Sequence, residues 1–489
     1  MQYKRVFTLV LAVVMSLSLA ACGGGGGATT TQAVTTAAAA TAAATTTAAA
    51  TEAATTSAAP VEIITWGINP VSVGSGNEEM INAFNEAHPN IKLIPQSTPG
   101  TDTASYATQD ISKLLAAIAA GTPPDVTWLD RFTVSQFASR DALTPITEYI
   151  EKSDLNLADF REYAVWEITF NDQIWALPWA TDVRIFYWNK DIFEEEGFDP
   201  EVPPKTWDEL IDFGLKMTKY DDAGNVTRIG YTPRYASSWL YLYGFQTGSQ
   251  WLSEDGKTAL INAAEPLKAL EFMVRAMDTI GGAETVMALS GAFLSGADHP
   301  FLNDQLAMFV TDTGMNTSIV RYKPEMNFGS APVPVPEDGA SPKSYGGGWS
   351  YCIPKGAKNP ELSFEVMKWL ITEGIIVQAA GIAEYSKEEY GIDVHLPPFA
   401  AYLPTLDKLK EIYIDPITIP NIVQLLKTTE DAMGYATCRP VSPVGEIIFT
   451  EMNRATERAL YHELTPQEAL DEANAIIQTE LDKFWESVN

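Results

Sequence analysis

Aromatic rings and a few charges gather in one stretch of the chain, Asn171 to Phe193, around a single proline. Within this stretch, Trp179 is followed at short spacing by Asp182 and Arg184. A flat aromatic ring covers an apolar surface at small entropy cost, and carboxylate or guanidinium groups form charge-assisted hydrogen bonds to hydroxyls. A sugar ring has apolar C–H faces and a rim of hydroxyls, so these three side chains have the chemistry to bind one.

Packing competes with ligand binding as the role of these side chains. Aromatic residues that alternate with more polar neighbours, or that lie on the first turn of a helix, are usually structural. On this basis we predict packing roles for Trp175, Phe186, Trp188 and Trp207. Asp182 and Arg184 have a second interpretation as well, since they could form a structural ion pair with each other.

The chain shows no pattern typical of a catalytic, metal or cofactor site. Its four histidines, at positions 88, 299, 395 and 462, are scattered and lack the spacing of a zinc-binding helix. Ser350 lacks the second glycine of a nucleophile elbow. The run from Asp221 to Asn225 is predicted to be a hairpin turn, because no glutamate follows at the spacing of a calcium loop.

The elements that position these residues begin with strands that alternate with helices. Strands are predicted at Val61–Trp66, Ile91–Ile94 and Val126–Leu129, with helices after Asn77, as the cap, and over Asp110–Ala120. This alternation predicts an α/β fold with a parallel sheet and helices on both faces. Open sheets of this kind bind ligands beyond the carboxyl ends of their strands, which places Trp66, Trp128 and the turn at Pro178 at a cleft.

Later elements have clear start signals. Val183–Trp188 alternates like a strand. The capping boxes Thr206–Glu209 and Thr465–Glu468 predict helix starts, and Pro360 suits a first helical turn. The last of these helices is predicted to bury one apolar face, made by Leu470, Ala473, Ile477 and Leu481.

The N-terminus predicts export and lipidation. Lys4 and Arg5 precede an apolar run that is short for a membrane span, and residues 1–21 therefore have the layout of a secretory signal. Leu19–Cys22 resembles a bacterial lipobox, in which Cys22 is lipidated. Residues 22–60 are mainly Gly, Thr and Ala and cannot bury a core, so they predict a flexible tether.

Charge and cysteine content narrow the class of partner. The formal net charge is −31, and it becomes −33 once Lys4 and Arg5 leave with residues 1–21. So negative a surface argues against nucleic acid as a partner and against charge-driven docking on anionic lipid. Cys352 and Cys438 could form a disulfide, but the sequence does not decide this.

Seven segments in order resemble one family, the extracellular solute-binding proteins of ABC importers, in the carbohydrate-binding group that includes maltose-binding protein. The most specific match is Tyr187 to Phe213, YWNKDIFEEEGF through PPKTWDELIDF. The others are Lys113–Asp130, Asp141–Ile150, Phe301–Gly314, Gly346–Leu370, Cys438–Pro443 and Thr465–Ile477.

The resemblance implies two α/β lobes joined by a hinge, with the ligand in the cleft between them. It assigns residues 61–177 and 347–396 to lobe 1, and residues 178–346 and 397–489 to lobe 2. Crossings are implied near Ala176–Trp179, Gly346–Trp349 and Pro397–Pro398. It also implies that the protein delivers its ligand to a permease. The lipid and the tether suggest the outer face of the cytoplasmic membrane, and we expect a monomer without a cofactor.

The same resemblance places Asp182 where the family often has an acidic ligand contact, and Asp130 with Arg131 on a similar polar pair. Where the family often has an aromatic residue, this chain has Asp312 to Met315, which implies a more polar surface or a stacking ring from Trp239. Several roles stay open: Trp66 and Trp128 could pack or bind, Trp239 could fill the second core, Trp349 could serve the hinge, and Arg439 could anchor a loop. The predicted ligand-binding set is Trp66, Trp128, Asp130, Arg131, Trp179, Asp182, Arg184, Trp239, Asp312 and Trp349.

Three functions follow as hypotheses. The first is a binding protein that captures a carbohydrate for an importer. The second is a binding protein for a non-sugar solute such as a polyol phosphate or a peptide; the few basic residues near the expected cleft argue against a dianion. The third is a cell-surface glycoside hydrolase, which would need two carboxylates flanking a cleft.

Overall fold

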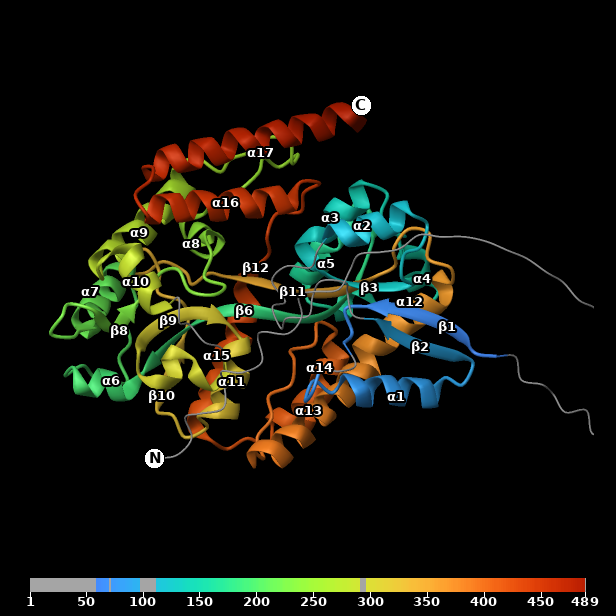
Figure 1. Cartoon of the computed structure of the whole chain (residues 1–489), viewed down its shortest axis with the longest axis horizontal. Helices are drawn as coiled ribbons and strands as arrows, with labels where there is room; N and C mark the ends of the chain where they lie inside the picture. The colour runs from blue at the N-terminus through green and yellow to red at the C-terminus, as the bar shows by residue number, and fades with distance from the viewer. Residues whose placement is uncertain (1–58, 70–71, 97–110, 291–295, 489) are drawn as a thin grey trace, which may run out of the picture. The chain divides into compact units, whose positions relative to one another are not determined.

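A ten-stranded sheet runs through the protein, which is described here from a computed structural model (Figure 1). The structure describes residues 59–69, 72–96, 111–290 and 296–488. The predicted signal sequence, Cys22 and most of the predicted tether lie outside these residues. The strand order is β2-β1-β3-β11-β6-β9-β8-β7, with β10 beside β6 and β12 beside β11.

The strands have the following bounds: β1 (Val61–Trp66), β2 (Ile91–Gln96), β3 (Val126–Asp130), β4 (Thr169–Phe170), β5 (Gln173–Ile174), β6 (Leu177–Asn189), β7 (Lys219–Tyr220), β8 (Val226–Tyr231), β9 (Leu306–Asp312), β10 (Phe328–Ala331), β11 (Ser344–Cys352) and β12 (Ala436–Thr437). Strands β4 and β5 form a separate hairpin.

The helices have these bounds: α1 (Asn77–Ala87), α2 (Ile111–Ala119), α3 (Arg131–Ser139), α4 (Thr147–Glu151), α5 (Glu162–Glu167), α6 (Lys190–Glu195), α7 (Trp207–Met217), α8 (Leu240–Thr247), α9 (Ala264–Thr279) and α10 (Gly282–Ser290). They continue with α11 (Gly314–Tyr322), α12 (Pro360–Trp369), α13 (Ile375–Tyr390), α14 (Leu403–Leu409), α15 (Pro420–Tyr435), α16 (Gly445–Leu460) and α17 (Pro466–Val488). Short 3₁₀ turns are η1 (Leu157–Asp159), η2 (Gly296–Asp298) and η3 (Pro300–Asn303), and π turns are η4 (Leu370–Gly374) and η5 (Lys410–Ile414).

The sheet is mixed, which corrects the expectation of a parallel sheet. Strands β2, β1 and β3 are parallel, as their alternation with helices predicts. Strand β11, however, enters from far along the chain and runs antiparallel to both β3 and β6. Local alternation could not reveal this insertion, because β11 is more than 200 residues from β3 in the sequence.

The helix starts follow the local sequence signals closely, with one exception. Thr206 and Glu209 form the predicted capping box of α7, and Thr465 and Glu468 exchange the same bonds before α17. The first helix is different, because Asn77 is its first residue and Gly76 is its cap in the left-handed region. The side-chain amide of Asn77 (Nδ2) instead donates to the backbone carbonyl of Asn69 at 2.9 Å.

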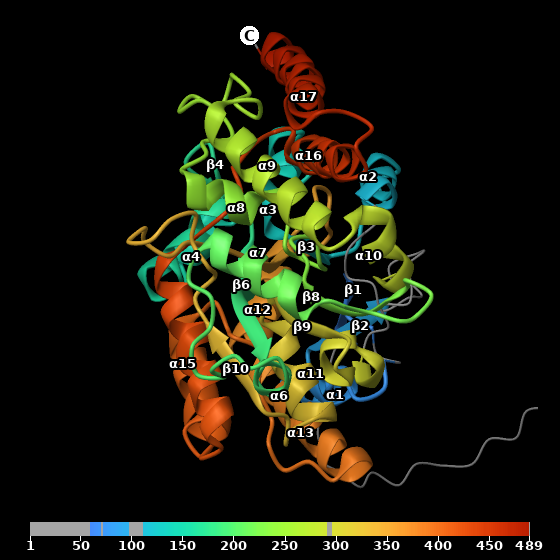
Figure 2. The ribbon, with the colours of Figure 1, turned by 90° about the vertical axis from the view of Figure 1, so that its left-hand side faces the viewer.

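Two hydrophobic cores lie along the sheet, and β6 and β11 connect them. Leu177 in β6 belongs to the smaller core, whereas Val183 further along the same strand belongs to the larger one. In β11 the order is reversed, with Tyr345 in the larger core and Tyr351 in the smaller core. Figure 1 shows these two strands crossing the middle of the sheet, and Figure 2 shows α16 and α17 with α8 and α9 over one side of the larger core.

One long helical stretch, Pro360–Tyr390, runs past both cores. Its residues Leu370 and Ile371 belong to the smaller core, and Ile375 and Ala379 belong to the larger one. The π turn η4 lies where the change occurs. By length and composition alone this stretch could cross a membrane, but half of its most apolar window is buried in the protein, as in an ordinary core helix.

Candidate functional site

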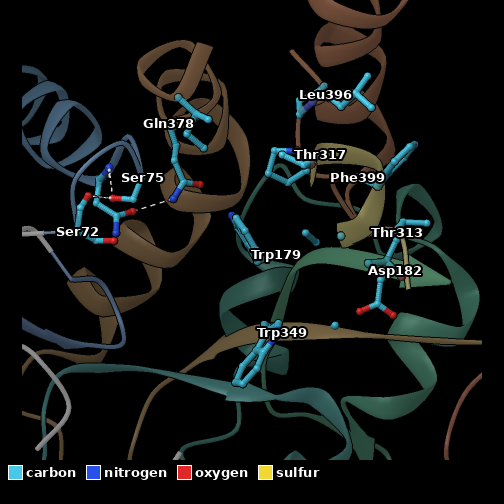
Figure 3. A pocket seen from close by; sticks show the side chains of 18 of the residues that line it. Ser72, Ser75, Trp179, Asp182, Thr313, Thr317, Trp349, Gln378, Leu396 and Phe399 are labelled. Atoms are coloured by element: carbon cyan, nitrogen blue, oxygen red, sulfur yellow. Dashed lines mark hydrogen bonds between the residues drawn. The ribbon is translucent and has the colours of Figure 1, made fainter. Parts of the chain in front are cut away.

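A cavity of about 740 Å³ opens where β6 and β11 pass between the two cores (Figure 3). Its wall comes from six parts of the chain: the loop before α1, β3, the first half of β6, the β9–α11 junction with α11, β11, and α13 with the segment after it. A cavity of this volume is in the range that holds small-molecule ligands.

Three tryptophans form one side of the cavity, and we call them the tryptophan cluster. Trp128 and Trp349 are stacked, with ring centroids 4.3 Å apart. Trp179 meets the Trp128 ring edge-on at 5.8 Å. Because Trp128 lies in β3, Trp179 lies near the start of β6 and Trp349 lies in β11, sheet pairing brings the three rings together.

Two carboxylates, the acidic edge, lie on neighbouring strands of the same sheet. Asp182 is in β6, and Asp312 ends β9, which pairs with β6. One oxygen of Asp182, Oδ1, accepts from Arg184 and from the backbone amide of Gly347. The other oxygen, Oδ2, has no hydrogen-bond partner among the described residues, and the Asp182 side chain is 30% exposed.

Beneath the cavity lies a buried arginine network of Arg131, Glu167, Arg439 and Asp130. Arg131 is fully buried and donates to Glu167 at 2.9 Å, to the Ala180 carbonyl at 2.7 Å and to the Gly347 carbonyl. It thereby joins β6 to β11 at the point where both strands pass between the cores. Arg439 donates to Asp130 at 2.6 Å.

Two members of this network, Glu167 and Arg439, have shifted pKa values. Burial raises the pKa of Glu167, and the neighbouring charges of Arg131 and Arg439 act against this shift. Burial by itself disfavours the charged form of Arg439, but Asp130 and Glu167 outweigh it, so the pKa of Arg439 is raised. Arg439 therefore stays charged at neutral pH.

A polar wall faces the tryptophan cluster from α11, α13 and the segment after α13. Gln378 donates to Asn77 at 2.7 Å, which links α13 to α1. His395 is 8% exposed, and its Nε2 atom is buried with no hydrogen-bond partner among the described residues. Burial, with a smaller contribution from the charge of Arg321, lowers the pKa of His395 to about 4, so this ring is neutral at pH 7.

The structure brings five of the ten predicted site residues to the cavity wall. These are Trp128, Trp179, Asp182, Asp312 and Trp349. Trp128 was predicted from the end of an expected strand, and Trp179 and Asp182 from the turn at Pro178. Asp312 and Trp349 were predicted from the family resemblance, through the segment Asp312 to Met315 and the implied crossing at Gly346–Trp349.

The other five predicted residues lie outside the cavity wall. The indole Nε1 of Trp66 donates a hydrogen bond to Oε1 of Gln96 at 3.3 Å, at an exposed position. Asp130 and Arg131 belong to the buried arginine network. Arg184 is buried against the ring of Tyr345, and Trp239 packs between Tyr345 and Phe449 in the larger core.

Several cavity residues were not predicted from the sequence. Apart from Phe399 they are mostly polar residues in loops and helices, including Asn69, Ser72, Ser75, Asn316, Thr317, Gln378 and His395. The predicted crossing at Pro397–Pro398 was the one signal near any of them, because both prolines line the cavity beside His395 and Phe399. Across the described residues no three His, Cys, Asp or Glu side chains form a group that could hold a metal ion.

The two cysteines that the structure describes are separate free thiols. Cys352 is buried at the end of β11, and Cys438 is partly buried after β12. Burial raises the pKa of both thiols, which makes them poor nucleophiles. The disulfide that the sequence left open is not formed in this structure.

A family model described as "Bacterial extracellular solute-binding protein" matches residues 67–377. The chain belongs to this family. Among curated relatives, this solute-binding protein is 25% identical over 319 residues to the sn-glycerol-3-phosphate-binding periplasmic protein UgpB of Salmonella typhimurium, covering 62% of this chain and 68% of the relative. It is also 25% identical over 337 residues to a putative binding protein of Brucella abortus, covering 67% and 78%.

Solved structures show that this solute-binding protein has the two-lobed α/β fold of sugar-binding relatives. CpMnBP1 with mannobiose bound superposes with a TM-score of 0.68 at 24% identity, covering 85% of this chain and 99% of that one. The sugar-binding protein MalE from Xanthomonas citri superposes with a TM-score of 0.64 at 21% identity, covering 86% and 98%. The fold class inferred from the sequence is thus confirmed.

Proposed function

We propose that this solute-binding protein captures a neutral carbohydrate in the cavity and delivers it to the permease of an ABC importer. The observation that carries this proposal is the placement of the tryptophan cluster beside Asp182, whose Oδ2 has no partner among the described residues. Aromatic faces cover the C–H faces of a sugar, and an unpaired carboxylate oxygen accepts from its hydroxyls. The printed ligands of similar structures, among them mannobiose, mannotriose and maltose, support the same class.

A polyol phosphate is the second candidate, since the curated relatives include glycerol-phosphate-binding proteins. The charge of the cavity wall disfavours it. In the described part of the wall, two carboxylates, Asp182 and Asp312, stand against one arginine, Arg321. His395 adds no positive charge at pH 7, because its pKa is about 4. A dianion would therefore meet net repulsion at its nearest neighbours.

A glycoside hydrolase is disfavoured by the position of the carboxylates. Glycoside hydrolysis uses two carboxyl groups on either side of the scissile bond. The two carboxylates in the described cavity wall, Asp182 and Asp312, lie on neighbouring strands and share the same cation, Arg184. They face the ligand from one side, which suits recognition rather than bond cleavage.

A thermal-shift screen tests these alternatives directly. The panel contains mannobiose, maltose, tagatose and sn-glycerol 3-phosphate, with each ligand followed for consumption. A ligand at a hundred times its dissociation constant stabilises the folded state by about 2.7 kcal/mol. We expect a neutral sugar to raise the melting temperature without being consumed. A response to glycerol phosphate alone, or hydrolysis of a sugar, would contradict the proposal.

We further propose that the two cores are the two lobes that close on the ligand, with boundaries as predicted: residues 61–177 and 347–396, and residues 178–346 and 397–489. The change of core within β6 and β11 supports the first two crossings. The third crossing is less simple, since Ile375 and Ala379 already pack in the larger core. Ligand contacts made to both lobes would select the closed state.

We also propose that the chain is exported and works as a monomer, held at the outer face of the cytoplasmic membrane by a lipid on Cys22. Membership of an extracellular family supports export. In cells grown with labelled fatty acid, the wild-type protein should carry the label, and Cys22→Ala should lose it and enter the medium or the soluble fraction. Equal labelling of both proteins would contradict lipidation at Cys22.

A further inference from the structure

Arg184 contacts Asp182 of the acidic edge directly but does not line the cavity. Its side chain is 4% exposed, and Nη1 donates to Oδ1 of Asp182. Its guanidinium lies 3.8 Å above the ring of Tyr345. This stacking and the bond from Nε to the carbonyl of Ser237, at 3.3 Å, fix the position of the cation.

Ser237 extends this arrangement to the second carboxylate. Its hydroxyl donates to Oδ2 of Asp312 at 2.6 Å and accepts from the Asp312 amide at 3.0 Å. The other oxygen of Asp312 accepts from the amide of Gly314 at 2.8 Å. Both carboxylates are therefore tied, one directly and one through Ser237, to the same buried guanidinium.

We propose that Arg184 is a positioning residue that fixes Asp182 and Asp312 as a pair of acceptors for two neighbouring hydroxyls of the ligand. This inference rests on the proposed function, because it states which hydroxyls of a bound sugar would donate to the acidic edge. A carboxylate oxygen has two lone pairs, so each group keeps acceptor capacity toward the cavity after its internal bonds are made. Groups held in place by buried partners bind with less loss of side-chain entropy.

The pair favours a ligand with two adjacent hydroxyls over a deoxy analogue. A site built to bond a hydroxyl rejects the analogue that lacks it, since the buried acceptor is then left unpaired. Because one cation serves both carboxylates, loss of Arg184 should loosen both acceptors together. Loss of the Ser237 hydroxyl should loosen Asp312 alone, since the Ser237 carbonyl that binds Arg184 remains.

Hydrogen exchange tests the positioning role without any ligand. The amides of Gly347 and Gly314 report on Asp182 and Asp312, to which they donate at 3.0 and 2.8 Å. We expect Arg184→Met to speed exchange about tenfold at both amides, and Ser237→Ala to do so at Gly314 only. The amides of β1 serve as the reference and should be unchanged. Unchanged exchange at Gly347 in Arg184→Met, or equal acceleration in β1, would overturn the proposal.

A second experiment, which measures ligand binding, distinguishes failure of this inference from failure of the proposed function. Mannobiose and its singly deoxygenated analogues are titrated calorimetrically against wild type, Arg184→Met, Asp182→Asn and the double variant. We expect Arg184→Met to weaken mannobiose binding at least tenfold, to reduce the discrimination against deoxy analogues, and to add little on top of Asp182→Asn. Weaker binding without faster exchange at Gly347 would mean that Arg184 contacts the ligand directly, which overturns positioning. If mannobiose and every sugar of the screen fail to bind wild type, the proposed function fails, and the exchange results still decide the role of Arg184.

Discussion

The imidazole of His395 lies in the cavity wall, and its charge depends on folding. Its pKa falls from 6.5 to about 4 because burial, and to a smaller extent Arg321, oppose the charged form. Between these two pH values the unfolded chain binds a proton that the folded chain does not. The stability of the folded state therefore falls as the pH falls through this window, by about 3 kcal/mol in total for this one group.

His395→Gln should remove this part of the pH dependence. Urea unfolding at pH 7 and pH 4.5 gives the free energy of unfolding at both ends of the window. We expect the wild type to lose about 2–3 kcal/mol more than the variant between these pH values. Parallel losses in the two proteins would show that His395 takes up its proton as easily in the folded state as in the unfolded chain.

The ion pair of Arg131 and Glu167 should also contribute to stability through burial, since both side chains are fully buried. Removing one member of a buried pair leaves an uncompensated charge, which costs about 3–5 kcal/mol. Glu167→Gln should therefore destabilise the protein by about this amount in urea at pH 7. The matched control is Glu148→Gln in the exposed pair with Lys152, where we expect a change below about 1 kcal/mol. Equal effects of the two variants would contradict the role given to the buried arginine network.

At the scale of elements, β11 has a backbone position, Gly348, that leaves no room for a side chain. Gly348 has φ +142°, and a Cβ atom there would lie 2.2 Å from the carbonyl oxygen of Ala180 and 2.4 Å from a nitrogen of Arg131. A side chain at this position must separate β6 from β11, or displace Arg131. Either movement disturbs the point at which the two strands pass between the cores.

Gly348→Ala should consequently lower the free energy of unfolding by more than about 2 kcal/mol and weaken ligand binding. Gly434 in α15 is a suitable control, because a Cβ there meets no atom within 4 Å. Gly434→Ala should leave stability unchanged or raise it by up to about 1 kcal/mol, as Gly-to-Ala changes do in helices. A tolerated alanine at position 348 would mean that the two strands can separate at little cost.

At the scale of the whole molecule, β6, β11 and the stretch Pro360–Tyr390 connect the two cores, and we propose that the angle between the cores changes when a ligand binds. The cavity wall has residues from elements of both cores, so a ligand gains its full set of contacts only when the cores approach. We expect small-angle scattering to show a smaller radius of gyration when a sugar from the screen saturates the protein. Trp179→Ala at the same sugar concentration should show the unliganded value. An unchanged radius despite saturated binding would contradict closure.

The sequence by itself determined the fold class, the helix starts at Thr206 and Thr465, and the presence of aromatic rings in β3 and near the start of β6. These features depend on local patterns: strand alternation, capping residues and a turn. Composition and pattern also sufficed to identify Trp128, Trp179 and Asp182 as candidates for the cavity wall. The roles of these residues in binding stay predictions.

Only the tertiary structure decided which charged and aromatic residues face the cavity. Arg131 and Arg184 are as polar as any ligand contact, but their partners Gly347 and Tyr345 lie more than 150 residues away in the sequence. Trp239 is half-buried for the same reason, by Tyr345 and Phe449. His395 and Gln378 join the wall through the packing of α13 and the segment that follows it. Burial is set by contacts between distant segments, and local sequence patterns carry no information about those contacts.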